Sequence, residues 1–528
     1  MRILSAAQMR AADELTTERL GIPQLQLMEN AAQAVLAVLA GRFGPLSDRV
    51  ISVLCGRGNN GGDGLALARL LRDAGARTQI FLFARPEELR DLPRIQYKRL
   101  RRGPQTRIVE IRSTTDWDGL LPVLRRSHCA VDALLGTGVS KPLAGLLLHA
   151  AESLNALDLP VVSIDIPSGL FSDDIAVATP CVHADVTVTF TAPKIGMLLS
   201  PAAGAVGEMI VAPIGTPADL VELSGARLSL VTRSVLEPLL RSRPRFSHKG
   251  DFGKVLIVAG SRGKSGAAVL AGLAALRAGA GLVTLAVPSA IQITLMAAAP
   301  PELMTEGLAS TPNGRLTAAA GSQILRLCES VDAVAIGPGL GTAAGTVSAV
   351  CQVVRKSPIP VVADADALNA LALTGRPFKA RSPLVLTPHL GEMGRLVGRT
   401  AEQVFVERLA LAGRFARERN CVLVLKGYRT LISDPEGETW INSTGNPGMA
   451  TAGCGDVLTG ILAALLARRQ RRPITSLSAA VAAAVYLHGA AGDAAASRLG
   501  EESMVAGDII ESLAEVFRIR NSELRIEN

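Results

Sequence analysis

The stretch VISVLCGRGNNGGDGLALARLLRDAG, residues 50–75, decides the fold of the first half of this 528-residue chain. Its first six residues are mostly apolar and β-branched, which predicts a buried strand. The glycine-rich block that follows predicts a tight loop, and the leucine- and alanine-rich remainder predicts a helix. Glycines between a strand and a helix let backbone N–H groups approach an anion at the helix start. The stretch therefore predicts one unit of a parallel α/β sheet, with a ligand site where the strand ends.

The same alternation of apolar strands and helical patterns continues on both sides of residues 218–244. Apolar strands separated by helices predict mostly parallel sheets that are covered on both faces. A chain of 528 residues is also too long for a single core. We therefore expect an α/β protein with an N-terminal domain at 1–217, a linker at 218–244 and a C-terminal domain at 245–528. The first domain is expected to be a Rossmann-like parallel sheet sandwich.

The composition excludes several classes of function. Apolar residues make up 48% of the chain and charged residues 19%, which is typical of folded α/β domains and not of a disordered chain. Aromatic residues make up only 3%, so the chain lacks the stacking surfaces used to bind single-stranded nucleic acid. The net charge of +8 suits a small anionic substrate. The seven cysteines form no CxxC pair, and no window matches a signal peptide or a membrane span. We expect a cytoplasmic protein with reduced thiols and no nucleic-acid or membrane partner.

Two familiar glycine motifs are incomplete in this chain. Gly263–Ser265 ends like a P-loop, but the glycine that a P-loop needs five positions earlier is replaced by Val258. The glycines within residues 56–61 fit G-x-G-x-x-G, but Arg85 stands where an NAD-binding fold would carry the acid for ribose. Neither a P-loop hydrolase nor an ordinary dehydrogenase is therefore favoured.

Three polar motifs follow strands of the first half: GRGNNGGDG at 56–64, VDALLGTGVSKPLAG at 131–145 and VVSIDIPSGL at 161–170. Because the ends of parallel strands meet at one edge of a sheet, we expect these motifs to lie together. A carboxylate that closes an apolar strand is partly desolvated, which raises its pKa toward an acid/base range. Each Asp taken singly could instead cap a turn or a helix. The three motifs together favour an acid/base site.

These blocks, together with TFTAPKIGMLLSPAAGAVGEMIVAPIG at 189–215, resemble the NAD(P)H-hydrate epimerase domain over residues 1–217. The resemblance implies that Asp165 is the catalytic acid/base and that a potassium ion is held by Asn60, Asp132 and Ser168. Neutral oxygens with a single carboxylate suit a weakly hydrated monovalent ion better than Mg²⁺ or zinc. The implied hydrate-binding residues are Asn59, Asn60, Gly61, Gly62, Asp63, Gly136, Thr137, Gly138, Val139, Ser140, Lys141, Pro142 and Asp165.

The second half carries its most informative stretch at 442–469, NSTGNPGMATAGCGDVLTGILAALLARR. Small residues lead into a glycine turn, and a strongly apolar helix pattern follows. Such a helix start forms an anion hole for a phosphoryl group. Asp456, in the first turn, is placed to accept a hydroxyl proton while that oxygen attacks phosphorus. The alternative is a helix capped by a glycine turn and an Asp.

Five further blocks precede this stretch: HKGDFGKVLIVAGSRGKSGAA at 248–268, AIGPGLG at 335–341, VVADADALNALA at 361–372, LTPHLGEMGRL at 386–396 and VLVLKGYRTLI at 422–432. In this order they resemble the ribokinase-like ADP/ATP-dependent NAD(P)H-hydrate dehydratases over residues 245–515, which implies a ribokinase-like fold. One departure is Cys454, where such enzymes commonly have serine or alanine. The implied hydrate contacts are Ala267, Gly339, His389 and the catalytic Asp456; the implied nucleotide contacts are Lys426, Gly427, Tyr428, Arg429, Thr430 and Gly455.

Both resemblances imply one substrate, the hydrate of NADH or NADPH (NADHX or NADPHX). They imply an isomerase that interconverts the R and S epimers, fused to a lyase that uses ADP or ATP, with Mg²⁺, to dehydrate the S epimer. With ADP the by-products would be AMP and phosphate. We also expect a homo-oligomer. The residues leave two alternatives open: a ribokinase-like vitamin or sugar kinase with an appended binding domain, and a non-catalytic first half.

Overall fold

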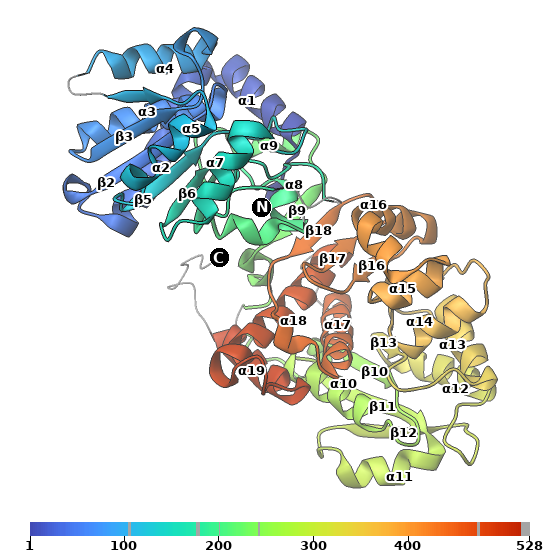
Figure 1. Cartoon of the computed structure of the whole chain (residues 1–528). Coiled ribbons are helices and arrows are strands. Elements are labelled where there is room, and N and C mark those ends of the chain that lie inside the picture. Colours follow the sequence, from blue (N-terminus) through green and yellow to red (C-terminus); the bar gives the residue numbers. More distant parts are fainter. Residues whose placement is uncertain (104–106, 176–179, 200, 241–242, 472–475, 519–528) are drawn as a thin grey trace. The chain divides into compact units, whose positions relative to one another are not determined.

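The computed structural model describes residues 1–103, 107–175, 180–199, 201–240, 243–471 and 476–518 (Figure 1). The end of the predicted C-terminal domain, 519–528, lies outside them. The chain divides into an N-terminal unit, Arg2–Arg227, and a C-terminal unit that begins at Leu228. Each unit is built on a mainly parallel sheet, which confirms the predicted fold class of two α/β domains.

The N-terminal unit contains a 7-stranded sheet in the order β4-β3-β2-β5-β6-β7-β8. All its neighbouring strands run parallel. The strands of this sheet are β2 (Val50–Cys55), β3 (Arg77–Leu82), β4 (Ile108–Glu110), β5 (Cys129–Ala133), β6 (Val161–Ile164), β7 (Val186–Phe190) and β8 (Glu208–Ala212). The short strand β1 (Arg2–Ile3) is not part of it. The helices of the N-terminal unit are α1 (Ala6–Leu20), α2 (Gln24–Phe43), α3 (Asn59–Asp73), α4 (Asp91–Arg101), α5 (Thr114–Asp118), α6 (Leu121–Leu124), α7 (Gly145–Asn155), α8 (Ile195–Leu199) and α9 (Ala218–Leu223).

Strand β2 shows why this sheet is covered on both faces. Alternate side chains of a strand point to opposite faces. Ile51 and Val53 pack in a core with α2 and α3, whereas Leu54 packs in a second core with residues of α5, α6 and α7. Both faces of β2 are therefore buried, which leaves the strand ends as the accessible part of the sheet.

The C-terminal unit carries a larger sheet, in which strands follow in the order β9-β18-β17-β16-β15-β14-β13-β10-β11-β12. Its strands are β9 (Leu228–Val231), β10 (Lys254–Val258), β11 (Leu282–Pro288), β12 (Met304–Leu308), β13 (Ala333–Ile336), β14 (Val361–Ala363), β15 (Leu384–Leu386), β16 (Val422–Leu425), β17 (Leu431–Ser433) and β18 (Thr439–Asn442). Its helices are α10 (Gly266–Arg277), α11 (Ser289–Ala298), α12 (Ala319–Leu327), α13 (Ala344–Lys356), α14 (Asp366–Leu373), α15 (Leu390–Val397), α16 (Ala401–Arg419), α17 (Cys454–Arg471), α18 (Leu477–Leu499) and α19 (Ala506–Arg518).

Strands β10 to β16 of this sheet run parallel, and β17 and β18 are antiparallel to their sheet neighbours β16 and β17. Helices α10, α17, α18 and α19 form one large apolar core with alternate residues of the strands, such as Val255 and Ile257. The carboxyl ends of β10, β13, β14, β15 and β16 consequently share one edge, beside the start of α17.

The segment 218–244 contains regular structure in each unit. Helix α9 belongs to the N-terminal unit, and β9 pairs in parallel with β18 in the C-terminal sheet. All seven cysteines are free thiols, six of them buried. Among the described residues, no helix combines the length and apolar character that a membrane crossing requires.

Candidate active sites at the strand ends

A cavity of about 750 Å³ opens at the strand ends of the N-terminal unit. Its walls come from α1, α2, the loop before α3, the loop after β5 and the residues that follow β6 and β7. Ten predicted site residues line it: Asn59, Asn60, Asp63, Gly136, Thr137, Gly138, Val139, Ser140, Lys141 and Asp165. The motifs that lie far apart in sequence therefore meet at one hollow of the molecule.

Asp165 is held by a buried lysine that the sequence did not single out. The Nζ of Lys194, a fully buried side chain, donates to Asp165 Oδ1 and lies 2.7 Å from Thr189 Oγ1. Asp165 has a φ of 67°, in the left-handed region that non-glycine residues seldom adopt. Backbone strain of this kind is concentrated at functional sites. The ion pair fixes the orientation of the Asp165 carboxylate and supplies its counter-charge.

Three more carboxyl groups, Asp13, Glu14 and Asp63, line the same cavity. Burial raises the pKa of Asp13 to about 6, with Lys194 lowering it and Asp165 raising it. Burial also raises the pKa of Asp63 well above its ordinary value, and the charge of Asp165 adds to this effect. Asp13 lies on a polar helix before the glycine block, so no strand-end motif indicated it.

The predicted potassium ligands form one oxygen cluster. Asp132 is completely buried and accepts from Ser168 Oγ at 2.5 Å and from the Ser168 N–H at 2.8 Å. Asn60 Nδ2 donates to the Leu135 carbonyl at 2.7 Å, and the Leu135 N–H donates to Ser168 Oγ at 2.8 Å. Asn60 Oδ1 is buried and accepts no hydrogen bond from a described residue. An oxygen left in this way fits a cation as its partner.

Three other predicted residues, Gly61, Gly62 and Pro142, are not among the residues that line the cavity. The two glycines serve close packing. A Cβ on Gly61 would lie 1.9 Å from the Gly56 carbonyl oxygen, and one on Gly62 would lie 2.8 Å from Met28 Cε. They allow α3 to begin directly behind the loop.

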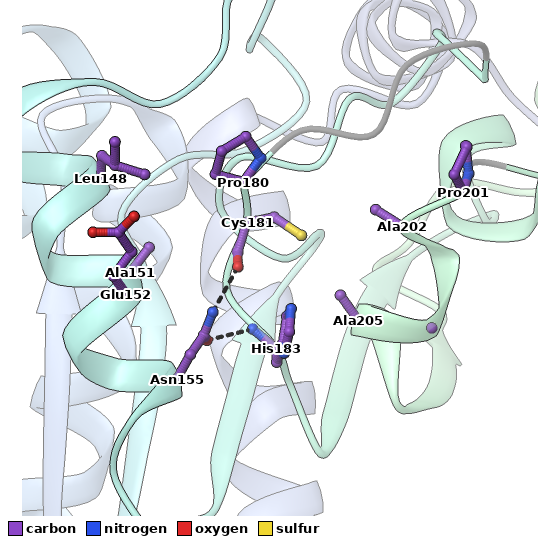
Figure 2. A pocket seen from close by; sticks show the side chains of 11 residues that line it. Leu148, Ala151, Glu152, Asn155, Pro180, Cys181, His183, Pro201, Ala202 and Ala205 are labelled. Carbon is purple, nitrogen blue, oxygen red and sulfur yellow. Dashed lines mark hydrogen bonds between the residues drawn. The ribbon is translucent and has the colours of Figure 1, made fainter.

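A second cavity of the N-terminal unit, about 290 Å³, contains none of the predicted site residues (Figure 2). The Asn155 side chain ties its wall together, because Nδ2 donates to the Cys181 carbonyl at 2.9 Å and Oδ1 accepts from the His183 N–H at 2.8 Å. Burial raises the pKa of the Cys181 thiol to about 11, with Asp132 adding to the shift. The thiol is therefore protonated at neutral pH and is a poor nucleophile.

In the C-terminal unit, Asp456 lies in the first turn of α17, as predicted. Burial raises the pKa of Asp456 to about 7, with Asp364 adding to the rise and Lys426 opposing it. A carboxyl group with this pKa can accept a proton near neutral pH and release it again. Asp456 therefore has the properties of a general base.

A buried ion pair lies next to this helix start. Lys426 Nζ donates to Asp364 Oδ1 at 2.7 Å, and the Asp364 carboxylate also accepts from Thr387 at 2.7 Å and from Thr459 at 2.8 Å. Burial opposes the charge of Asp364, but Lys426 and the hydroxyl groups outweigh it and hold the pKa below its ordinary value. Burial likewise opposes the charge of Lys426, and Asp364 and Glu392 raise its pKa above the ordinary value. The lysine is thus a fixed positive charge at the strand ends.

The predicted hydrate contacts Ala267 and Gly339 lie side by side. A Cβ on Gly339 would be 3.2 Å from Ala267 Cβ and 3.0 Å from the Lys264 carbonyl oxygen, and the φ of Gly339 is 65°. The loop at 259–265, which ends in Gly263–Ser265, thus packs on the loop after β13. Ser261 Oγ donates to the Gly339 carbonyl at 2.6 Å and joins the two loops.

His389 precedes α15 and caps it. Its Nδ1 accepts from the Gly391 N–H at 3.0 Å, while Glu392 accepts from the His389 N–H at 2.9 Å. The His389 side chain is 53% exposed, and its other ring nitrogen, Nε2, lies 3.5 Å from Glu392 Oε1. The next strand end is adjacent, because the Lys426 N–H donates to the Pro388 carbonyl at 2.8 Å.

The predicted nucleotide contacts occupy the turn between β16 and β17. Tyr428 is 71% exposed, and Arg429 donates to the Ser443 carbonyl at 3.2 Å. Thr430 Oγ1 donates to the Gly427 carbonyl at 3.0 Å. A Cβ on Gly455 would lie 3.5 Å from Lys426 Nζ, so the Gly455 backbone is next to the buried ion pair.

Cys454 turns its side chain into the apolar core and is 5% exposed. The cysteine side chain thus packs among apolar residues at this position. Its carbonyl oxygen lies 3.0 Å from His488 Nε2, a contact that the sequence did not indicate. Burial lowers the pKa of His488 to about 4, so the ring is neutral at physiological pH.

Comparison with known proteins gives matches along the whole chain. A family model described as YjeF-related protein N-terminus matches residues 24–196, and one described as NAD(P)H-hydrate dehydratase matches residues 255–515. A protein of Moorella thermoacetica named Bifunctional NAD(P)H-hydrate repair enzyme Nnr is 42% identical over 531 residues, covering 100% of this chain and 98% of that protein. The Escherichia coli protein of the same name is 34% identical, covering 99% of this chain and 95% of its own.

Among solved structures, the ADP/ATP-dependent NAD(P)H-hydrate dehydratase from Bacillus subtilis, co-crystallised with ATP/Mg²⁺, is 31% identical. The match covers 55% of this chain and 97% of that one, with a TM-score of 0.47.

Proposed function

Since this chain belongs to the bifunctional NAD(P)H-hydrate repair enzymes, we propose that its N-terminal unit interconverts the R and S hydrates and its C-terminal unit dehydrates the S hydrate. One observation supports the proposal most strongly: in each unit the candidate site lies at the strand ends of that unit's own sheet. The chain is also similar over its full length to bifunctional NAD(P)H-hydrate repair enzymes. A chain with a non-catalytic first half would not need the charged cavity around Asp165.

In the epimerase half, Asp165 is the acid/base group. Its carboxylate is oriented by Lys194 and faces a cavity lined by the loop before α3, the start of α3 and the loop at 134–141. The backbone groups of these loops suit the phosphates and ribose of a dinucleotide. Lys194 supplies the counter-charge of the Asp165 carboxylate.

A potassium ion would be held in the epimerase half by Asn60, Asp132 and Ser168. The fit rests on the unpartnered Asn60 Oδ1 and on a donor set of neutral oxygens with one carboxylate. The Leu135 carbonyl, which lies between Asn60 and Ser168, adds a further oxygen to the set. Such an ion supplies a positive charge that orders the loops around the hydrate.

Replacing potassium by lithium should slow the interconversion of hydrate epimers about tenfold, because a smaller ion does not match the oxygen cluster. The measurement is the rate of epimer exchange without nucleotide, followed by chromatography. The epimerisation rate of Asn60→Ala should depend less on potassium than that of the wild type. EDTA should leave the rate of both proteins unchanged. Loss of activity in EDTA, with rescue by a divalent metal, would show that the ion has been assigned wrongly.

In the dehydratase half, Asp456 accepts the proton of the hydrate's hydroxyl group while that oxygen attacks the terminal phosphorus of the nucleotide. The bond from phosphorus to the rest of the nucleotide breaks, which releases AMP when the nucleotide is ADP. The lone pair of the ring nitrogen then expels the phosphate, and loss of a proton from the neighbouring carbon restores NAD(P)H. Lys426 and the backbone around Gly455 supply positive charge and N–H groups for the transferred phosphoryl group.

The nucleotide is proposed to be ADP or ATP, bound along the turn at 426–430 with an accompanying Mg²⁺. The part of the chain described by the structure has no group of three or more His, Cys, Asp or Glu side chains placed to hold a metal ion. A magnesium ion that enters on the nucleotide phosphates and keeps several waters needs no such group.

The test is to incubate the purified chain with mixed epimers of NADH hydrate and ADP, and to follow the return of NADH absorbance. Complete recovery from both epimers, with release of AMP and phosphate, is the expected result. A vitamin or sugar kinase would instead accumulate a phosphorylated product and leave the hydrate unchanged.

A further inference from the structure

Four acidic side chains (Asp13, Glu14, Asp63 and Asp165) and four basic ones (Arg10, Arg57, Lys141 and Lys194) line the cavity of the N-terminal unit. Asp13 comes from α1, Asp63 from the first turns of α3, Asp165 from the end of β6 and Lys194 from the loop after β7. Only Asp165 has Lys194 as a hydrogen-bonded partner. Burial raises the pKa of Asp13 and of Asp63, so at least one of these two carboxyl groups is expected to keep a proton.

Asp13 is the carboxyl group best suited to keep and deliver that proton. Its hydrogen-bonding contact to a side chain is weak, with Thr216 Oγ1 at 3.5 Å from Asp13 Oδ1. Burial raises the pKa of Asp13 to about 6, so this group can hold a proton and release it near neutral pH. A donor with a pKa near the working pH transfers its proton more readily than one with a very high pKa.

This inference rests on the proposed epimerase function. We propose that Asp13 is a second catalytic residue, the proton donor that acts together with Asp165 as proton acceptor. Epimerisation must break and remake a bond at one ring carbon so that the oxygen changes face. An acceptor and a donor on separate segments can act at the same time, one on the atom that loses a proton and the other on the atom that gains one.

The proton balance holds for both possible routes. In ring opening, Asp165 takes the hydroxyl proton, the O–H electron pair forms a carbonyl, the carbon–nitrogen bond breaks, and the ring nitrogen takes the proton of Asp13. In loss of water, Asp13 protonates the hydroxyl group, the carbon–oxygen bond breaks as the nitrogen lone pair forms a double bond, and water leaves. Water then adds to the other face and gives its proton to Asp165. Return of the proton to Asp13 closes either cycle.

The test uses the full chain with Asp13→Asn, which removes the proton but keeps the size of the side chain. The substrate is purified R hydrate of NADH with excess ADP, and NADH absorbance is followed after subtraction of the rate without enzyme. The expected result is a fall in kcat of at least tenfold with little change in KM. Dehydration of the S hydrate by the same sample should be unchanged, which shows that the protein is folded and that the other half works.

Glu18→Gln is the matched control, because it removes one negative charge from an exposed position of the same helix. It should leave conversion of the R hydrate within threefold of the wild type.

The pH profile separates proton donation from a structural role. Asp13 is faced by Lys194, Asp165, Asp63, Glu14 and Arg10. In the wild type, kcat for the R hydrate should fall as pH rises above about 6, because Asp13 loses its proton. Asp13→Asn should lack this limb of the pH profile, that is, the fall in kcat above about pH 6. Thr216→Val removes a hydroxyl group that lowers the pKa of Asp13, so the limb should move to higher pH.

The proposal is overturned if the wild type converts the R hydrate and Asp13→Asn does so within threefold, with the same pH limb. If Asp13→Asn does not fold, Thr216→Val decides: an unmoved limb overturns the proposal and a limb at higher pH supports it. A wild-type chain that dehydrates only the S hydrate would instead refute the proposed epimerase function itself.

Discussion

Asp456→Asn should lower the rate of S-hydrate dehydration by roughly 100- to 10,000-fold, the usual cost of removing a general base. Asparagine keeps the shape of the side chain and its place in the first turn of α17, so nucleotide binding should persist. The measurements are kcat and KM for the S hydrate and the Kd of ADP by calorimetry. A fall in kcat with an unchanged Kd separates the loss of a base from the loss of a binding site.

The pH dependence of the same reaction has a definite sign. Burial raises the pKa of Asp456 to about 7, and only the deprotonated carboxylate can accept the hydroxyl proton. The dehydration rate of the wild type should therefore rise as the pH increases through 7. The rate of Asp456→Asn should not show this rise. The raised pKa also means that the folded unit binds more protons than the unfolded chain between the ordinary carboxyl range and pH 7, so this group's contribution to stability falls as pH rises through that window. The variant should be at least as stable as the wild type at pH 8.

The control for Asp456→Asn is Asp508→Asn. Asp508 lies in the first turn of α19, and its carboxylate accepts from the Val505 N–H at 2.8 Å. It matches Asp456 in helix position but is remote from the glycine turn in sequence. Its activity should stay within threefold of the wild type. Equal losses in the two variants, or a rate near wild type in Asp456→Asn, would remove Asp456 from the role of base.

The sequence allowed the fold class to be predicted because strands and glycine turns are local signals. The continuous burial of β2 and the helix start at Asn59 both follow from one stretch of 26 residues, 50–75. The motifs at strand ends could be expected to meet, since parallel strands end at one edge of a sheet. The segment 218–244 gave no such signal, because α9 and β9 are short and packed by residues distant in sequence.

Other parts of the sites could not be predicted from local patterns. Lys194 follows a strand in a stretch without a glycine turn, and only the fold shows that its Nζ reaches Asp165. Asp13 lies on a helix whose polar residues resemble an ordinary solvated face. Thr387 and Thr459 are separated by more than 70 residues, yet both donate to Asp364. Contacts of this kind depend on tertiary packing, which neither periodicity nor motif spacing encodes.

The buried pair of Lys426 and Asp364 leads to the largest expected effect on stability. Asp364 is 1% exposed and the Lys426 side chain 20% exposed, so little water can solvate either charge. Asp364→Asn keeps one acceptor oxygen, for either Thr387 or Thr459, and replaces the other oxygen by an NH2 donor. It leaves the more distant Glu392, at 3.9 Å, as the ion-pair partner of Lys426. Removing one partner of a buried pair typically costs about 3–5 kcal/mol. The free energy of unfolding of the C-terminal unit should fall by about that amount at pH 7.

This loss should be read from the C-terminal unit alone. The chain has two tryptophans, of which Trp117 lies in the N-terminal core and Trp440 on β18. In a Trp117→Phe background, the fluorescence of Trp440 during urea unfolding reports on the C-terminal unit. Glu407→Gln is the control, because it breaks an exposed ion pair with Arg399, 2.7 Å apart, and exposed pairs are worth about 0–1 kcal/mol.

The sign of the pH dependence follows from the two shifted pKa values. The pKa of Asp364 is below its ordinary value, so its contribution is present above the ordinary carboxyl range and is lost as pH falls below it. The pKa of Lys426 is above its ordinary value, so the contribution of its charge is lost at strongly alkaline pH. The difference between Asp364→Asn and the wild type should therefore be largest near neutral pH and shrink toward strong acid. A second substitution, Lys426→Met, added to Asp364→Asn should recover part of the stability, because it removes the charge that was left without a partner. If Asp364→Asn unfolds at the same urea concentration as the wild type, the ion pair does not stabilise the unit. The role of Lys426 would then be confined to the site, where its Nζ lies close to Gly455.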